Sequence, residues 1–188
     1  MKLKLGFATM SVSVLLTACQ STQTSRLEAV ATAPKTAPAA AAAPAGASAS
    51  TNEIIIDDQD LGFKSEGEWT LGDSGADFKG GTLWAVGTSA GAAASTATWT
   101  PDIKIAGIYD VYEWHGDDPN SDHASNAPFT VKSEDGTKTI LVNLRNNTGK
   151  WNLLGTFKFA AGKGGNVSVS SKADGNVLAD AVKFVPHQ

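Results

Sequence analysis

Residues 129–142 read FTVKSEDGTKTILV, and this stretch decides the fold class. Apolar and polar residues alternate over 129–132, which is the period of a strand with one buried face. Residues 134–137 (EDGT) form a turn signal, and apolar residues return at alternate positions over 140–142. Two alternating runs joined by an Asp-Gly turn predict an antiparallel β-hairpin.

On both sides of this hairpin, the chain contains further short apolar or alternating runs with turn signals between them. These runs cover 54–56, 97–100, 108–114, 151–159, 167–170 and 177–185. No helical period is found in residues 53–188. The sequence therefore predicts an all-β fold, a jelly-roll β-sandwich of about ten short antiparallel strands.

The composition changes sharply at Glu53. Residues 20–52 are low in complexity, and Ala dominates from Ala29 to Ala49 with prolines interspersed. Prolines remove backbone donors and stop helices, and this stretch holds almost nothing that could build a core. We therefore predict a signal segment over 1–18, a disordered Ala/Pro-rich linker over 19–52 and one folded domain over 53–188.

The N-terminus has the layout of an export signal. Two lysines precede an apolar stretch of about twelve residues, too short for a hydrocarbon core that needs roughly twenty. Residues 16–19 (LTAC) resemble the lipobox of bacterial lipoproteins, which implies acylation of Cys19 and anchoring in a lipid bilayer. Gln20 is not the Asp that commonly marks inner-membrane retention, so we expect the cell envelope, at the outer membrane. An ordinary signal peptide with a chance Cys is the alternative.

Charge and cysteine content narrow the classes of partner. The chain carries 15 basic and 19 acidic side chains, a formal net charge of −4. Phosphate binding needs a basic face, so no nucleic-acid partner is expected. Cys19 is the single Cys, so the domain is expected to hold its fold without an internal disulfide.

Motifs spread through the folded part resemble one known family, the golvesin C-terminal-like domain, also called the xanthan-lyase carbohydrate-binding-like domain. The matching segments are Asp57, 67–69 (GEW), 97–101 (ATWTP), 106–112 (AGIYDVY) with Trp114, 127–131 (APFTV), 149–157 (GKWNLLGTF) and 179–184 (ADAVKF). The resemblance implies a jelly-roll carbohydrate-binding module. The chain departs from it by lacking an Arg over 115–123 and by having Val-Asn-Leu at 142–144 where Val-Asp-Gln is common.

The loop over 115–126 is the strongest candidate for a metal site. Oxygen ligands alternate along it, and calcium accepts carboxylates and amides in irregular loops. An EF-hand loop is excluded, because its sixth and twelfth positions hold His123 and Phe129. The candidate calcium ligands are Asp117, Asp118, Asn120 and Asp122. A plain solvated loop and a zinc site from the two histidines with an Asp remain open.

Sugar recognition in water needs a flat aromatic ring together with polar groups that bind hydroxyls. The candidate ligand-binding residues are Trp84, Tyr112, Trp114, His115, Asn120 and His123. Trp69, Trp99 and Trp151 lie within the family motifs and are expected to be structural, because aromatic side chains on strands usually pack in the core.

Acidic residues give little sign of catalysis. Asp180 lies in an Ala-rich run, so we expect its carboxylate to accept backbone N–H groups and stabilise a corner. Asp57 and Asp58 are adjacent and would point to opposite faces of a strand, so a surface turn is the simpler reading. No nucleophile elbow, P-loop or His-Glu-x-x-His motif is present. We therefore predict no enzyme.

Three functions stay open at this level. The first is a lipid-anchored, non-catalytic module that binds an envelope or extracellular polysaccharide. The second is a structural subunit that docks on an envelope or secretion-complex protein. The third is a small esterase or lyase, which would need a pocket with converging titratable groups.

Overall fold

The computed structural model describes residues 52–73, 75–88, 93–117 and 122–188. The predicted signal segment and linker, including Cys19, lie outside these residues. The described residues form the strands β1 (Ile54–Ile56), β2 (Phe63–Glu66), β3 (Thr70–Gly72), β4 (Thr82–Ala85), β5 (Thr96–Trp99), β6 (Gly107–Trp114), β7 (Ala127–Ser133), β8 (Gly136–Val142), β9 (Trp151–Phe159), β10 (Asn166–Ser170), β11 (Val177–Ala179) and β12 (Ala181–Pro186).

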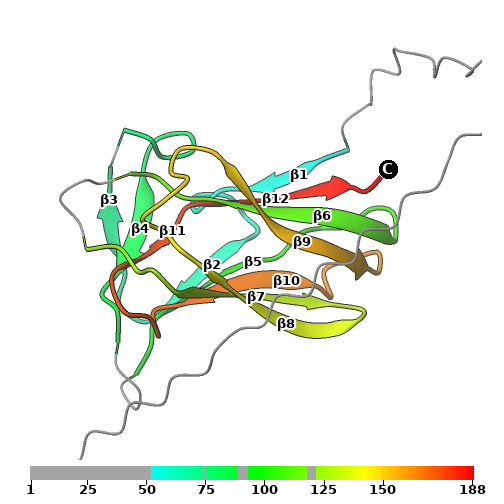
Figure 1. Ribbon diagram of the computed structural model, residues 1–188. Coiled ribbons are helices and arrows are strands. Elements are labelled where there is room, and N and C mark those ends of the chain that lie inside the picture. The colour runs from blue at the N-terminus through cyan, green and yellow to red at the C-terminus, as the bar shows by residue number, and fades with distance from the viewer. Residues whose placement is uncertain (1–51, 74, 89–92, 118–121) are drawn as a thin grey trace, which may run out of the picture. The chain divides into compact units, whose positions relative to one another are not determined.

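These strands form two large facing sheets and one small sheet (Figure 1). The four-stranded sheet has the order β1-β12-β6-β9, and the five-stranded sheet has the order β2-β5-β10-β7-β8. The three-stranded sheet β11-β4-β3 lies at one end of the sandwich. Every strand pairing within these sheets is antiparallel. The predicted all-β sandwich is confirmed.

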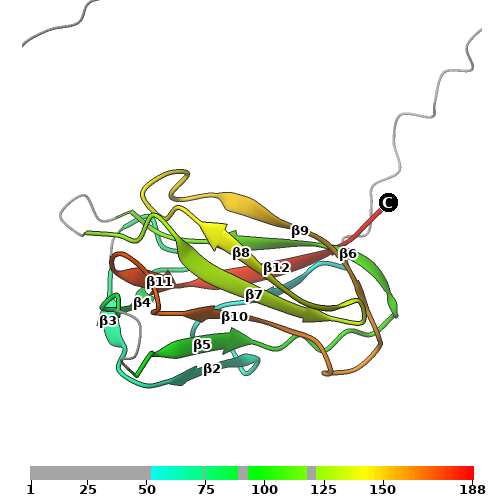
Figure 2. The same cartoon turned by 60° about the horizontal axis from the view of Figure 1, so that its bottom comes forward.

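The hairpin that decides the fold forms as predicted. β7 and β8 pair along their whole length, from Ala127 opposite Val142 to Ser133 opposite Gly136. Gly136 has a φ of 104°, which a side chain would strain, and this explains the Asp-Gly turn. Figure 2 shows the hairpin at the edge of the five-stranded sheet.

The core lies between the two large sheets and consists of the inward residue of each alternating pair. Trp99 of β5 stacks on Phe129 of β7, with ring centroids 6.3 Å apart. In the four-stranded sheet, Phe159 of β9 meets Tyr109 of β6 and Phe184 of β12 edge-on. Trp99, predicted to be structural, is 1% exposed. Burial of large aromatic side chains is a main source of stability in such sandwiches.

A β-bulge changes the pairing of side chains on the four-stranded sheet. The pairing of β6 with β9 shifts between Val111 and Tyr112, where β9 holds one extra residue, Leu154. Gly155 of β9 has a φ of 145° at this bulge. The shift sets Leu153 of β9 opposite Tyr112 of β6.

The closing segment differs from the prediction of one strand over 177–185. The chain leaves one sheet at Ala179 and enters another at Ala181, so it forms β11 and β12. β11 pairs with β4, whereas β12 pairs with β1 and β6. Asp180 lies at the break, and its carbonyl accepts a hydrogen bond from Trp99 Nε1 at 3.2 Å instead of a strand partner.

No helix among the described residues is long and apolar enough to cross a membrane.

Candidate functional site

The structure distributes the predicted site residues over separate places. Trp84 lies at a groove on the small sheet, and Tyr112 and Trp114 lie on the outer face of the four-stranded sheet. His115 and His123 are buried, at 1% and 5% exposure, so neither ring lies on an accessible surface. Cys19, Asp118 and Asn120 lie outside the described residues.

The groove at Trp84 has a volume of about 410 Å³ and is open to solvent. Its lining includes Glu68, Thr70, Trp84, Val86 and Ser95. Trp84 stands opposite Thr70 of β3 and Leu178 of β11, and its inner part packs against the core. A β-carbon added at Gly72 would lie 3.2 Å from Trp84 Cδ1, so the indole ring needs a glycine beside it.

The polar rim of this groove is ordered by hydrogen bonds. Ser95 Oγ donates to the Glu68 carbonyl at 2.8 Å and accepts the Glu68 N–H at 2.9 Å. The backbone on both sides of Glu68 is therefore fixed, while its side chain is exposed. An accessible indole next to a fixed polar rim is the combination of groups that a sugar ring requires.

The aromatic side chains on the outer sheet face contact one another. Trp114 meets Trp151 edge-on at 5.4 Å, and Phe78 contacts both rings. Lys183 Nζ lies 4.6 Å from the Trp151 ring centre and 5.2 Å from that of Tyr112. These cation–π contacts cover part of the ring faces. Tyr112 and Trp114 therefore have less free ring surface for a ligand than their position on the sheet suggests.

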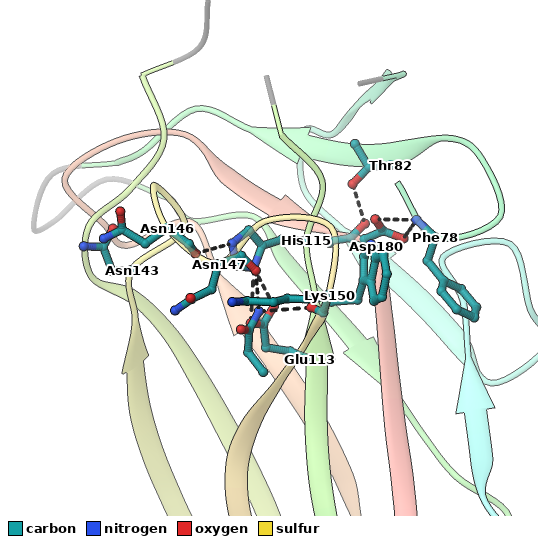
Figure 3. A network of polar contacts seen from close by, with 12 residues as sticks. Phe78, Thr82, Glu113, His115, Asn143, Asn146, Asn147, Lys150 and Asp180 are labelled. Atoms are coloured by element: carbon teal, nitrogen blue, oxygen red, sulfur yellow. Dashed lines mark hydrogen bonds and ion pairs between the residues drawn. The ribbon is translucent and has the colours of Figure 1, made fainter. Parts of the chain in front are cut away.

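His115 forms a buried polar cluster with the neighbouring strand and loop (Figure 3). Its Nδ1 lies 2.9 Å from Oε2 of Glu113, which is 0% exposed. Its Nε2 donates to the Asn146 carbonyl at 3.1 Å. The ring is held on both sides, so the structure gives His115 a structural contact in place of the predicted ligand contact.

The described ends of the 115–126 loop are held by ion pairs and backbone contacts. Arg145 Nε donates to the His123 carbonyl at 2.6 Å, and Arg145 Nη2 lies 3.5 Å from Asp122 Oδ1. Asp117 and Asp122 are exposed. Among the described residues, no three Asp, Glu, His or Cys side chains converge as a metal site. Because Asp118 and Asn120 lie outside the described residues, a calcium site in this loop stays a prediction.

Three buried aspartates form a cluster that the sequence reading did not find. Asp57, Asp58 and Asp180 are 3%, 9% and 1% exposed. The predicted turn at Asp57 and Asp58 forms, because the Asp60 N–H donates to the Asp57 carbonyl at 3.0 Å. Its predicted position on the surface was wrong, because both aspartates are buried. The predicted corner role of Asp180 is confirmed, since both its carboxylate oxygens accept the Phe78 N–H, at 3.3 and 3.1 Å (Figure 3).

This environment disfavours ionisation of the cluster. Burial raises the pKa of Asp180 to about 8, although the hydrogen bond from Phe78 opposes the shift. Burial also raises the pKa of Asp58 to about 7, and repulsion from Asp57 and Asp77 adds to it. The pKa of Asp57 is raised by burial, against an opposing effect of Lys79. Raised pKa values of this kind are found both for carboxyl groups buried for structural reasons and for carboxyl groups at functional sites.

Comparison with known proteins adds a family. The model of the Golvesin C-terminal domain matches residues 54–186. Xanthan lyase of Bacillus sp. (strain GL1) is 34% identical over 137 residues, which are 70% of this chain and 14% of that protein.

Solved structures give matches of the same kind. Paenibacillus xanthan lyase aligns with a TM-score of 0.66 at 34% identity, over 72% of this chain and 13% of the enzyme. A family 35 carbohydrate binding module from Clostridium thermocellum aligns with a TM-score of 0.47 at 13% identity, over 70% of this chain and 98% of the module. This chain spans about one-seventh of the length of the xanthan lyases that it matches.

Proposed function

The chain belongs to the Golvesin C-terminal domain family, and on this premise we propose that its folded part is a non-catalytic module that binds carbohydrate. Its relatives carry the same domain as about one-seventh of a polysaccharide lyase. A domain that accompanies polysaccharide-degrading enzymes is suited to holding a polysaccharide near a partner or a surface.

The observation that carries the proposal is the groove at Trp84. It is concave, contains an accessible indole and has a rim fixed by the Ser95–Glu68 hydrogen bonds. Stacking of a pyranose on an indole removes apolar C–H groups from water, and the rim supplies partners for hydroxyl groups. Tyr112 and Trp114 rank second, because their rings contact neighbouring side chains.

A binding role fits the groove better than a catalytic one. Glu68 is the one titratable side chain among the described residues that line it. Glycoside chemistry usually needs two carboxyl groups across the bond. The carboxyl groups with raised pKa values, Asp58 and Asp180, belong to the buried cluster instead.

The test is a glycan array probed with the full-length chain, with xanthan as the first polysaccharide. We expect Trp84→Ala to weaken binding about 5- to 150-fold, because stacking on an aromatic ring contributes about 1–3 kcal/mol. Tyr112→Ala is the matched control, since it removes an aromatic ring from the other face. Loss of binding with Tyr112→Ala and not with Trp84→Ala would move the site to the outer sheet face, and a blank array would overturn the function.

We further propose that the module is tethered to the outer membrane through acylated Cys19, with residues 20–52 as spacer. The support is the LTAC motif at 16–19 and the Ala/Pro-rich composition that follows it. Each buried methylene contributes about 0.8 kcal/mol, so several acyl chains give lasting attachment. Metabolic labelling with a palmitate analogue should mark the parent chain and not Cys19→Ser. Equal labelling of both would exclude this anchor.

A second function, docking on an envelope protein, is favoured by a different groove. This groove has a volume of about 480 Å³ and is lined in part by Ile105, Ile108 and Pro186. Ile105 and Ile108 are 66% and 51% exposed, so apolar surface is open beside the start of β1. Cross-linking in intact envelopes should capture a defined partner with the parent and lose it with Ile108→Lys. Capture that is equal for both chains would remove this function.

A further inference from the structure

The groove proposed to bind carbohydrate is bordered by a segment whose backbone is held at several points. Ser95 binds the Glu68 backbone through two hydrogen bonds. Trp69 Nε1 donates to the Glu66 carbonyl at 3.1 Å. Gly67 has a φ of 87°, and a β-carbon there would lie 2.7 Å from Ser95 Oγ, so this position requires glycine. The Glu68 side chain is therefore attached to the rim of the groove at a fixed point.

Among the described residues that line this groove, Glu68 is the one that carries a charge. Its side chain is exposed, so it is ionised at neutral pH. Within the described part of the chain it forms no ion pair. Residues 89–92 lie outside the described residues, between Thr88 and Ala93 of the lining, but their sequence is SAGA and adds no charge. The lining is thus acidic as well as aromatic.

Two lysines lie beside segments that line the groove, but neither is part of the lining. Lys64 Nζ pairs with Glu66 at 2.5 Å, so a carboxylate outside the groove already compensates its charge. Lys172 follows Ser171, whose carbonyl accepts the Thr88 N–H at 2.8 Å. An anionic sugar in the groove would therefore face one carboxylate and, in the described lining, no cation to balance it.

On the premise that this groove binds carbohydrate, as proposed above, we infer that it selects polysaccharides without acidic groups and prefers sugars that carry a protonated amine. The Trp84 indole binds the sugar ring whatever its substituent, because stacking uses the C–H groups of the ring. Glu68 distinguishes the substituents. Its carboxylate attracts an ammonium group, accepts a hydrogen bond from a hydroxyl group and repels a second carboxylate.

The exposure of Glu68 sets the size of this selectivity. Solvent screens an exposed ion pair, so we expect an amino sugar to bind up to about fivefold more tightly than the neutral sugar. A uronate should bind more weakly than the neutral sugar by a similar factor, up to about fivefold, because like charges repel. Both differences should shrink at high salt, which screens exposed charges further.

The experiment is calorimetric titration of the full-length chain at low salt with matched oligosaccharides that differ in one substituent. One series consists of β-linked glucose, glucosamine and glucuronate oligomers of equal length. Two further series use the galactose and mannose counterparts, with the linkage kept constant within each series. In a series that binds, we expect the affinity to fall from the amino sugar to the neutral sugar to the uronate. Trp84→Ala should weaken every member, because all of them stack on the same ring.

Glu68→Gln removes the charge from the rim and keeps a polar side chain of similar size. It should bring the three members of a series to within about twofold of one another, because the remaining stacking does not depend on charge. Glu134→Gln is the matched control, since it makes the same change of net charge at the turn between β7 and β8, outside the groove. Lys172→Gln removes the neighbouring cation. Both controls should keep the order of affinities.

The outcomes separate this inference from the proposed function. If the parent chain binds the uronate as tightly as the amino sugar, and Trp84→Ala weakens both, the groove binds carbohydrate but the inference is overturned. An order of affinities that Glu68→Gln leaves unchanged, or that Lys172→Gln abolishes, overturns it as well. If no member of any series shows binding that depends on Trp84, the proposed function is contradicted and the inference falls with it.

Discussion

Two buried polar clusters of this sandwich differ in how well the hydrogen bonds of their groups are satisfied; Figure 3 labels Glu113 and His115 of the first and Asp180 of the second. In the first, Glu113 faces His115 at 2.9 Å and the ring reaches the Asn146 carbonyl. In the second, Asp57, Asp58 and Asp180 are all carboxyl groups, and two oxygen atoms have no hydrogen bond. The groups of the first cluster bind one another, whereas burial in the second favours the neutral form of the carboxyl groups.

The comparison shows why burial alone does not identify a functional residue. His115 was a candidate ligand residue because it begins a polar loop, yet its burial serves the fold. Asp57 and Asp58 were assigned to a turn, yet their burial leaves polar atoms without partners. The informative quantity is the balance of donors, acceptors and charge around each buried group.

The largest effect on stability is expected from breaking the Glu113–His115 pair. Glu113→Ala leaves the His115 ring buried without its partner, and we expect the free energy of unfolding to fall by about 3–5 kcal/mol. Urea denaturation measures this loss. Glu113→Gln is the matched control and should lose less, because the amide still accepts a hydrogen bond. A loss below about 1 kcal/mol for Glu113→Ala would mean that the pair contributes little to stability.

The next largest effect is expected from the pH dependence of stability that the buried aspartates cause. Folding raises the pKa of Asp58 to about 7 and that of Asp180 to about 8. Raised carboxyl pKa values stabilise the folded chain at pH values below the unfolded pKa. That contribution is lost as pH rises through the folded values. Stability should therefore fall between about pH 4 and pH 8, by a few kcal/mol.

Neighbouring groups set the limits of this window. The charges of Asp60 and Lys79 act on Asp57, and those of Asp57, Asp60 and Asp77 act on Asp58. Asp110 acts in the opposite sense, because hydrogen bonds from Thr156 and His187 lower its pKa. Its stabilisation is lost only as pH falls below the usual Asp range. Urea titrations across pH measure the profile, and a rise in stability from pH 5 to pH 8 would contradict it.

A smaller effect on stability is expected from Lys79, which pairs with Asp60 beside the buried aspartates. Lys79→Met removes the charge and keeps the β-carbon at a position whose φ is 57°. We expect a loss of about 0.5–1 kcal/mol, at the upper end for an exposed pair, because the charge also offsets Asp57. Urea denaturation measures this loss, and an unchanged free energy of unfolding would show that the Lys79 charge does not act on the cluster.

The smallest effect is expected outside both clusters. The Arg145–Asp122 pair is exposed, at 3.5 Å. Asp122→Asn should change stability by less than about 0.5 kcal/mol. A larger change in a thermal melt would show that the 115–126 loop is tied to the core more firmly than the surface pair suggests.

Prediction from sequence succeeded where the signal was local. The hairpin of β7 and β8, and the runs that became β1 and β9, follow from alternation and turn chemistry. β2 and β3 were not recognised, because they are short and exposed and show no alternation. Trp99 was correctly predicted to be a core residue, whereas Trp69 and Trp84 are both partly buried against the core. The strand that carries Trp84 was not predicted.

The candidate sites were predicted less well, for a physical reason that Asp180 illustrates. Its corner role could be inferred from the apolar run around it. The donor to its carboxylate, Phe78, is 102 positions away in the chain. No local pattern specifies such a partner.

The fold class and the family could be determined from the sequence alone, because alternation, turn residues and motif order are local features of the chain. The tertiary structure alone decided which polar groups are buried together and which aromatic ring stays open. Antiparallel pairing brings β1 beside β12 and β4 beside β11 across large separations in sequence. Burial and charge balance arise from such neighbours, so they exist only once the sheets have assembled.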